Sequence, residues 1–142
     1  MKNHDTSGAP PEGYQTVSPY LLYEDADRAV GWLTQGFGFV ERRVTTGAAG
    51  RNHHELILGD DGLVMLGQMG PAFRSMKTLG VDSPAMVHVY VEDVDALHQR
   101  AKAAGADVTG LEISPAGDKR FMATDPEGIT WLFAQRISGQ AL

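Results

Sequence analysis

The sequence contains a similar five-residue signature twice, and this repetition constrains the fold more than any other feature. Tyr-Glu-Asp-Ala-Asp occupies residues 23–27, and Val-Glu-Asp-Val-Asp occupies residues 91–95. Each signature follows a run of strand-forming residues and begins a segment with apolar residues at helical spacing. The acidic residues suit a helix start, because their carboxylates accept hydrogen bonds from free backbone N–H groups and complement the helix dipole. The chain is therefore predicted to consist of two similar halves.

Hydrophobic spacing predicts the same order of elements in both halves: a strand, a helix and three further strands. The connector between the halves, residues 68–85, contains two Gly and two Pro, and one helical turn is expected in it near residues 73–79. The predicted strands cover residues 17–23, 39–45, 53–58, 63–67, 86–91, 107–113, 120–124 and 129–135, and the predicted helices cover residues 26–37 and 92–104.

This order predicts an α+β fold in which two βαβββ modules form a curved mixed sheet. A helix covers one face of each module and leaves the other bare, so the bare faces are expected to line a shared cleft. The length of 142 residues suits a single domain. We predict a disordered tail at 1–15, one domain at 16–136 (module one 16–68, linker 69–84, module two 85–136) and a second tail at 137–142.

Composition removes several classes of function. The absence of Cys excludes disulfides, Cys-ligated zinc, iron–sulfur clusters and cysteine nucleophiles. The net charge of −6 opposes binding to phosphate backbones and anionic lipid, so neither nucleic acid nor membrane is an expected partner. No apolar run is long enough to cross a bilayer, and the polar N-terminus does not look like a signal peptide. We therefore expect a cytoplasmic protein.

Four stretches together resemble the vicinal oxygen chelate superfamily, the group of glyoxalases, bleomycin-resistance proteins and extradiol dioxygenases. They are YEDADRA at 23–29, LGDDGLVMLG at 58–67, VHVYVEDVDA at 87–96 and DPEGITWLFAQ at 125–135. The Asp-Pro-Glu-Gly turn after a second βαβββ unit is the most specific of these. The resemblance implies a homodimer in which modules from two chains build each cavity.

Metal-using members of this superfamily hold a divalent ion with His, Glu or Gln side chains from the first and fourth strands of each module. Counting from the shared motifs places those positions at Ser18, Met65, Met86 and Leu132. These side chains do not form a site for a divalent cation. The resemblance therefore points to the metal-free bleomycin-resistance type, with no cofactor and with no metal ligands.

Alternation along the strands predicts the lining of the cleft. In the strand at 86–91 the valines are expected to pack under the helices, which leaves Met86, His88 and Tyr90 facing the cleft. A lining of Met and aromatic side chains suits a planar or apolar ligand, although the same residues would also serve as ordinary core. The predicted ligand-binding set is Ser18, Tyr20, Met65, Met86, His88, Tyr90, Thr130 and Leu132, together with Phe73 from the connector.

Residues 53–55 read His-His-Glu, and neighbouring strand residues point to opposite faces, so the two histidines cannot both bind one ion. His53 and Glu55 share a face, and with His88 across the cleft they would form a weak metal site. We expect instead a surface or hydrogen-bonding role for them. His88, His53 or Tyr90 would supply proton transfer if the protein were an enzyme.

We favour a metal-free binding protein that sequesters or carries a small organic, drug-like or secondary-metabolite molecule, as in antibiotic resistance. The alternative is an enzyme on the same fold. It would be a lyase, isomerase or dioxygenase with a divalent metal, or a metal-free biosynthetic enzyme that uses His88 or His53. A third alternative is a regulatory or structural protein with an empty cleft.

Overall fold

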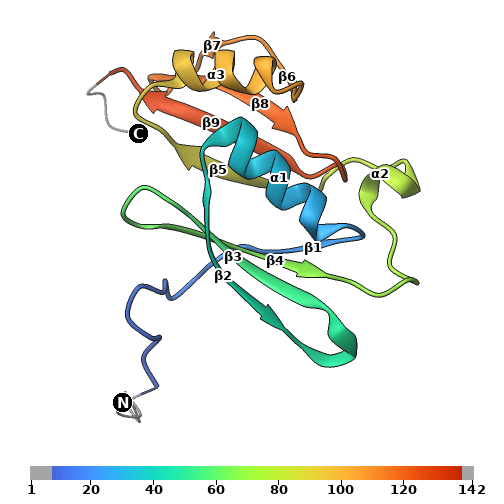
Figure 1. Cartoon of the computed structure of the whole chain (residues 1–142). Coiled ribbons are helices and arrows are strands. Elements are labelled where there is room, and N and C mark those ends of the chain that lie inside the picture. Colours follow the sequence, from blue (N-terminus) through green and yellow to red (C-terminus); the bar gives the residue numbers. More distant parts are fainter. Residues whose placement is uncertain (1–7, 139–142) are drawn as a thin grey trace.

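The computed structural model describes residues 8–138 and contains the two predicted modules, joined by a connector (Figure 1). The connector contains one short helix, α2 (Met76–Leu79). Module one comprises β1 (Tyr20–Tyr23), α1 (Ala26–Phe37), β2 (Val40–Thr46), the 3-10 turn η1 (Ala48–Gly50), β3 (Asn52–Leu58) and β4 (Gly62–Gln68). Module two comprises β5 (Met86–Tyr90), α3 (Val94–Ala103), β6 (Asp107–Val108), β7 (Glu112–Ile113), β8 (Asp118–Thr124) and β9 (Thr130–Arg136).

Each module forms its own mixed sheet, and the strand orders correspond. Sheet one has the order β1-β4-β3-β2, and sheet two has the order β5-β9-β8-β6 with β7 also paired to β8. In both sheets the first strand runs parallel to the last strand of its module, and the other pairs are antiparallel. The α+β fold with two βαβββ modules is thus confirmed, and within one chain the modules form two separate sheets.

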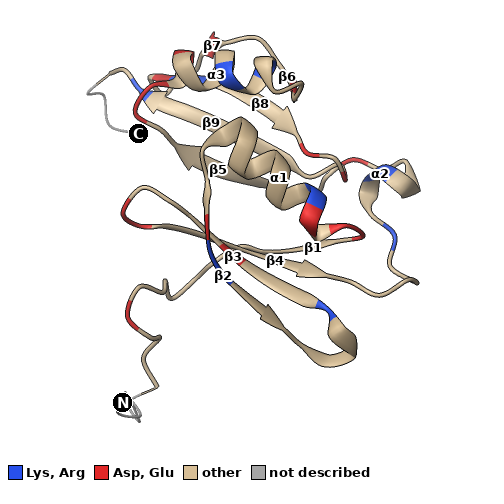
Figure 2. Ribbon diagram, viewed as in Figure 1, with Lys and Arg blue, Asp and Glu red and all other residues tan. Residues whose placement is uncertain are grey.

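The repeated acidic signatures begin the two long helices, as predicted. The Asp25 carboxylate accepts a hydrogen bond from the N–H of Arg28, and the Asp93 carboxylate accepts one from the N–H of Ala96. Figure 2 shows the acidic residues at the start of α1 and on the loop between β3 and β4. Helix α1 ends at Phe37 and is capped by Gly38, whose φ of 76° is a left-handed conformation that glycine adopts without strain.

The core lies between the two sheets and is filled by one face of α1 and of α3. Phe37 of α1 stacks on Phe133 of β9 with ring centroids 4.5 Å apart, and Phe133 stacks in turn on Phe121 of β8. On the side of sheet one, Leu56 and Leu66 are fully buried in the same cluster. Because α1 contributes to the packing of both sheets (Figure 1), neither module has a core of its own.

The Asp-Pro-Glu-Gly turn joins the modules. The buried Asp125 carboxylate accepts hydrogen bonds from the Tyr23 hydroxyl (2.7 Å), the Trp131 indole N–H (3.3 Å) and two backbone N–H groups of its own turn. The Glu127 carboxylate accepts the backbone N–H groups of Glu24 and Asp25 at 2.6 and 2.7 Å. These bonds connect module two to the start of α1, and we call them the module clasp.

The connector is held at its helix by Glu24. The carboxylate of Glu24 accepts hydrogen bonds from the Thr78 hydroxyl at 2.6 Å and from the Ser75 N–H at 2.7 Å. These bonds, that of Thr78 first, lower the pKa of Glu24 from its ordinary value to about 2. The acidic residues at the start of α1 thus serve both the helix and the connector.

Two predicted segments differ from the observed ones. The predicted strand over 107–113 is two short strands, because regular pairing with β8 stops after Val108. Thr109 still donates its N–H to the Met122 carbonyl oxygen, but its hydroxyl accepts the N–H of Met122 at 2.8 Å. The first strand begins at Tyr20, three residues after the predicted start. In β2 a register shift between Glu41 and Arg43 marks a bulge.

The predicted tails lie partly outside the described residues, at positions 1–7 and 139–142. Within the predicted N-terminal tail, Tyr14 already makes hydrogen bonds to module one. Among residues 8–138, no helix is both long and apolar enough to cross a membrane.

Candidate functional site

Each sheet has one face against the helices and one bare face, as the alternation in the sequence predicted. In β5, Val87 and Val89 pack against the core, whereas Met86 and Tyr90 on the other face are 58% and 55% exposed. On sheet one, Tyr20 (52% exposed) and Leu22 are likewise large and accessible. Apolar side chains gathered on an exposed face indicate a surface that binds a ligand or a protein.

The structure distributes the predicted ligand-binding residues over both bare faces. On sheet one, Tyr20 pairs in register with Met65. On sheet two, Met86 pairs with Thr130 and His88 with Leu132, and the His88 and Tyr90 rings lie 4.8 Å apart. Outside the strands, Ser18 lies two residues before β1, and Phe73 is half-buried in the connector.

A cavity of about 320 Å³ brings residues of the two modules together. His88 and Tyr90 of β5 line it from module two. Pro19, Leu63 and the turn between β3 and β4 line it from module one. Its volume is at the small end of the range of ligand pockets. The predicted residues His88 and Tyr90 therefore share a cavity with module one, within a single chain.

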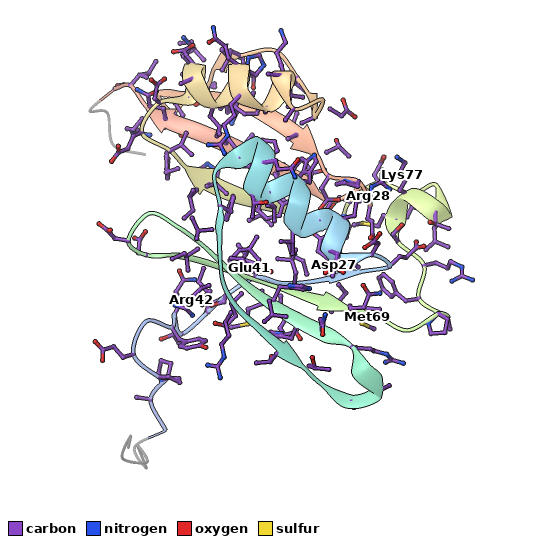
Figure 3. All side chains as sticks on the ribbon, in the orientation of Figure 1. Asp27, Arg28, Glu41, Arg42, Met69 and Lys77 are labelled. Atoms are coloured by element: carbon purple, nitrogen blue, oxygen red, sulfur yellow. The ribbon has the colours of Figure 1, made fainter. Side chains whose placement is uncertain are left out.

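A buried carboxylate lies on the bare face of sheet one. Glu55 is only 5% exposed, and its oxygens accept hydrogen bonds from the Tyr14 hydroxyl (2.8 and 2.9 Å) and from the Arg42 guanidinium (2.9 Å). Arg42 extends toward the N-terminal segment (Figure 3), where it bonds to the Gly13 carbonyl oxygen and lies over the Tyr14 ring. Burial alone would raise the pKa of Glu55, but the bonds from Tyr14 and Arg42 outweigh it and lower the pKa.

His53 and Tyr20 form a pair beside this carboxylate. The Tyr20 hydroxyl lies 2.8 Å from Nδ1 of His53, and the two rings are 5.1 Å apart. Nε2 of His53 lies 3.8 Å from the nearest oxygen of Glu55. The expectation of a hydrogen-bonding role for His53 and Glu55 is therefore confirmed.

His54 points to the opposite face and is buried between sheet one and α1. Its Nδ1 lies 2.7 Å from the Glu41 carboxylate and its Nε2 lies 3.4 Å from that of Asp27. Figure 3 shows Asp27 and Glu41 between α1 and sheet one. Alternation thus separates the two histidines as predicted, one to the bare face and one to the core side.

The residues at the metal positions of the superfamily do not fit a metal ion. A hydroxyl, two thioethers and an isobutyl group, from Ser18, Met65, Met86 and Leu132, offer no anionic or imidazole ligand. Within the described part of the chain, no three or more His, Cys, Asp or Glu residues are grouped so that they would hold an ion. The alternative set of His53, Glu55 and His88 is therefore not assembled within one chain.

A second cavity, of about 640 Å³, lies on the side of the module clasp. It is lined by Trp32, by Thr130 and by the cations Arg28 and Lys77, which lie near one another in Figure 3. Acidic residues at 82, 107 and 125 also line it. Of the predicted ligand-binding residues, it includes Thr130.

Sequence reasoning missed Tyr14 and the contact of Arg42 with Glu55. No periodicity marks an aromatic residue in an irregular segment, so no signal could have linked Tyr14 to Glu55. Arg42 lies at the bulge in β2, which shifts the alternation that such predictions depend on.

Two βαβββ modules with bare sheet faces define the class of protein. The family model described as the Glyoxalase/Bleomycin resistance protein/Dioxygenase superfamily matches residues 15–133. The chain therefore belongs to this superfamily, as the sequence stretches indicated.

Similar proteins agree with this assignment. The uncharacterized protein Rv0887c of Mycobacterium tuberculosis (strain ATCC 25618 / H37Rv) is 33% identical over 126 residues, which cover 85% of this chain and 74% of that protein. TioX from Micromonospora sp. ML1 is 31% identical, with a TM-score of 0.66 over 89% of this chain and 100% of TioX. TnmS3, an antibiotic binding protein from Streptomyces sp. CB03234, shares the fold at 21% identity, with a TM-score of 0.63 over 87% of this chain and 99% of TnmS3.

Proposed function

We propose that the protein is a metal-free binding protein that sequesters or carries a small organic molecule, drug-like or a secondary metabolite, in the cytoplasm. The observation that carries this proposal is the chemistry of the bare faces. A hydroxyl, two thioethers and an isobutyl group stand where catalytic relatives would need metal ligands, and Met86, Tyr20 and Tyr90 are accessible. TnmS3 supports the proposal, because it demonstrates that a protein of this fold binds an antibiotic.

The lining favours planar ligands held mainly by dispersion. Methionine side chains are polarizable and adapt to irregular shapes, and aromatic rings stack on flat molecules. Met86 and Met122 of sheet two and Tyr20 and Leu22 of sheet one provide such surfaces. Charged groups on these faces are paired with one another, Glu55 with Arg42 and Asp118 with Arg136, so binding would depend mainly on contact area.

The proposed functional unit is a homodimer. In one chain the two bare faces belong to separate sheets, and each exposes large apolar residues. A second copy that places its sheet two over sheet one of the first would cover both faces and enclose a ligand between them. Sedimentation at micromolar concentration should then give the mass of a dimer.

The test is a thermal-shift and calorimetric screen of planar antibiotics against protein purified without chelators. A ligand present at 100 times its Kd should stabilise the protein by about 2.7 kcal/mol. Met86→Ala and Met122→Ala should weaken binding. Ile113→Ala should not, because Ile113 is about as exposed as Met86 but shares with its strand partner Lys119 the face of sheet two that contacts α3. Stoichiometric zinc, nickel, manganese or iron in the purified protein would overturn the metal-free assignment.

We also propose that the connector covers the mouth of the ligand cavity between the bare faces, with Phe73 in contact with the ligand. The half-buried position of this ring in a connector anchored to Glu24 supports that role. Unchanged ligand affinity in Phe73→Ala would refute it.

A further inference from the structure

Tyrosine hydroxyls stand on both bare faces, and each is already bonded to a neighbour within its own sheet. Tyr20 of sheet one is bonded to His53, and Tyr90 of sheet two is bonded to Asp118. Both rings are about half exposed. A hydroxyl has one hydrogen to donate and two lone pairs that accept, so the direction of each bond decides what the oxygen offers to a ligand.

The direction is unambiguous for Tyr90. An ionised carboxylate only accepts hydrogen bonds, and the Asp118 carboxylate is paired with the Arg136 guanidinium at 3.4 Å. The Tyr90 hydroxyl therefore donates to Asp118 at 3.0 Å. Its oxygen is left with lone pairs alone, and Tyr90 lines the cavity that it shares with His88.

For Tyr20 the direction depends on which nitrogen of His53 carries the proton. Nε2 lies 3.8 Å from the Glu55 carboxylate, which the bonds from Tyr14 and Arg42 keep ionised. The negative charge favours the tautomer with its proton on Nε2. Nδ1 then has only a lone pair, so the Tyr20 hydroxyl must donate to it across 2.8 Å.

The backbone beside Tyr20 keeps this arrangement in place. Gly67 lies opposite His53 in β4, and a Cβ at Gly67 would come within 2.8 Å of the Tyr20 ring. Only glycine therefore lets the ring lie flat over β4 and reach His53. Two separate residues, Glu55 and Gly67, thus fix the position and the donor direction of one exposed hydroxyl.

We propose that Tyr20 and Tyr90 are specificity-determining hydrogen-bond acceptors, which select ligands that present O–H or N–H donors at the edge of a planar apolar body. In the proposed dimer, a ligand between sheet one of one copy and sheet two of the other meets one oxygen of each, and a hydroxylated or amide-bearing aromatic compound satisfies both. The same compound capped as a methyl ether leaves the two oxygens without a donor once water is excluded. This inference rests on the proposed binding function.

The probes that test it are 6,7-dihydroxycoumarin and 6,7-dimethoxycoumarin, a pair that differ in donor capacity on one planar ring system. The wild type should bind the dihydroxy compound about tenfold more tightly by calorimetry. Tyr20→Phe and Tyr90→Phe should each reduce this preference, and the double variant should abolish it while the rings remain. The matched control is Tyr23→Phe, which removes a fully buried hydroxyl and should leave the preference intact.

A measurement without ligand tests the Tyr20 half separately. Nitrogen NMR of His53 should find the proton on Nε2, and Glu55→Gln should shift the tautomer toward Nδ1. A proton on Nδ1 in the wild type would overturn the role of Tyr20 whatever the coumarins do. A donor preference that persists in the double Phe variant would overturn the proposal. If neither coumarin binds while the His53 tautomer is as expected, the result counts against the binding function rather than against the hydrogen-bond directions.

Discussion

Removal of the Asp125 carboxylate should be the most damaging single change in the protein. The side chain is only 3% exposed and accepts four hydrogen bonds. The Asp125→Ala variant leaves the hydroxyl of Tyr23, the indole N–H of Trp131 and the N–H groups of Glu127 and Ile129 without this acceptor. Burial and the negative charge of Asp125 raise the pKa of Tyr23, so the hydroxyl is a reliable donor at every working pH.

The expected magnitude follows from these partners. A buried donor left unsatisfied costs about 1–3 kcal/mol, and water that enters the space of the lost side chain will satisfy some of the four. We therefore expect a loss of about 3–5 kcal/mol in the free energy of unfolding, which is a large part of the stability of a typical domain. Tyr23→Phe removes one donor and leaves the carboxylate with three, so it should cost only about 1.5–2 kcal/mol.

The assay is urea unfolding followed by tryptophan fluorescence, at one fixed protein concentration because dimerisation would shift the midpoint. Trp131 contacts Asp125 directly, so its emission reports on the clasp. In the Asp125→Ala background, Tyr23→Phe should cost almost nothing, since it then removes an orphaned hydroxyl. Additive effects of the two substitutions, or a loss below 1 kcal/mol for Asp125→Ala, would refute the argument.

Three further predictions concern other contacts. Gly67→Ala should push the Tyr20 ring away and abolish the preference for donor-bearing ligands at a stability cost of about 1 kcal/mol or less; unchanged preference would show that the ring has room. The pKa of Glu24 is lowered to about 2, so the stabilising effect of its carboxylate is present above its usual pKa and is lost as the pH falls from 4.5 toward 2. The urea midpoint of Glu24→Gln should therefore change less with pH in this window than that of the wild type. An unchanged pH profile would contradict this. Arg42→Met should lower the stability by leaving buried Glu55 without its cation, and added Glu55→Gln should recover part of the loss. A lower stability in the double variant than in the single one would contradict the ion-pair account.

The architecture was largely predictable because the spacing of apolar residues along the chain indicates each strand and helix. Alternation of the valines in β5 and the helical spacing after residue 26 each determine a buried face, and a repeated signature fixes where both modules begin. The separation of His53 from His54 followed from the same rule, and both residues lie where it predicts.

The contacts of the site were less predictable because they join distant segments. Tyr14 reaches Glu55 across 41 positions, and Asp125 reaches Tyr23 across 102. No local pattern encodes such pairs. The Asp-Pro-Glu-Gly stretch was interpreted as a turn, which it is, but the buried carboxylates of that turn also hold the two modules together.

The bulge in β2 has a consequence for the behaviour of the protein in concentrated solution. β2 is the outer strand of sheet one, and every residue of it is exposed. A long, flat outer strand offers unpaired N–H and C=O groups to any other strand that meets it, which invites fibrillar association. The register shift between Glu41 and Arg43 interrupts that row of groups, and the adjacent charges of Arg42 and Arg43 repel a second copy in the same alignment. The irregularity that shifts the strand pattern around Arg42 thus also protects an open sheet edge from aggregation.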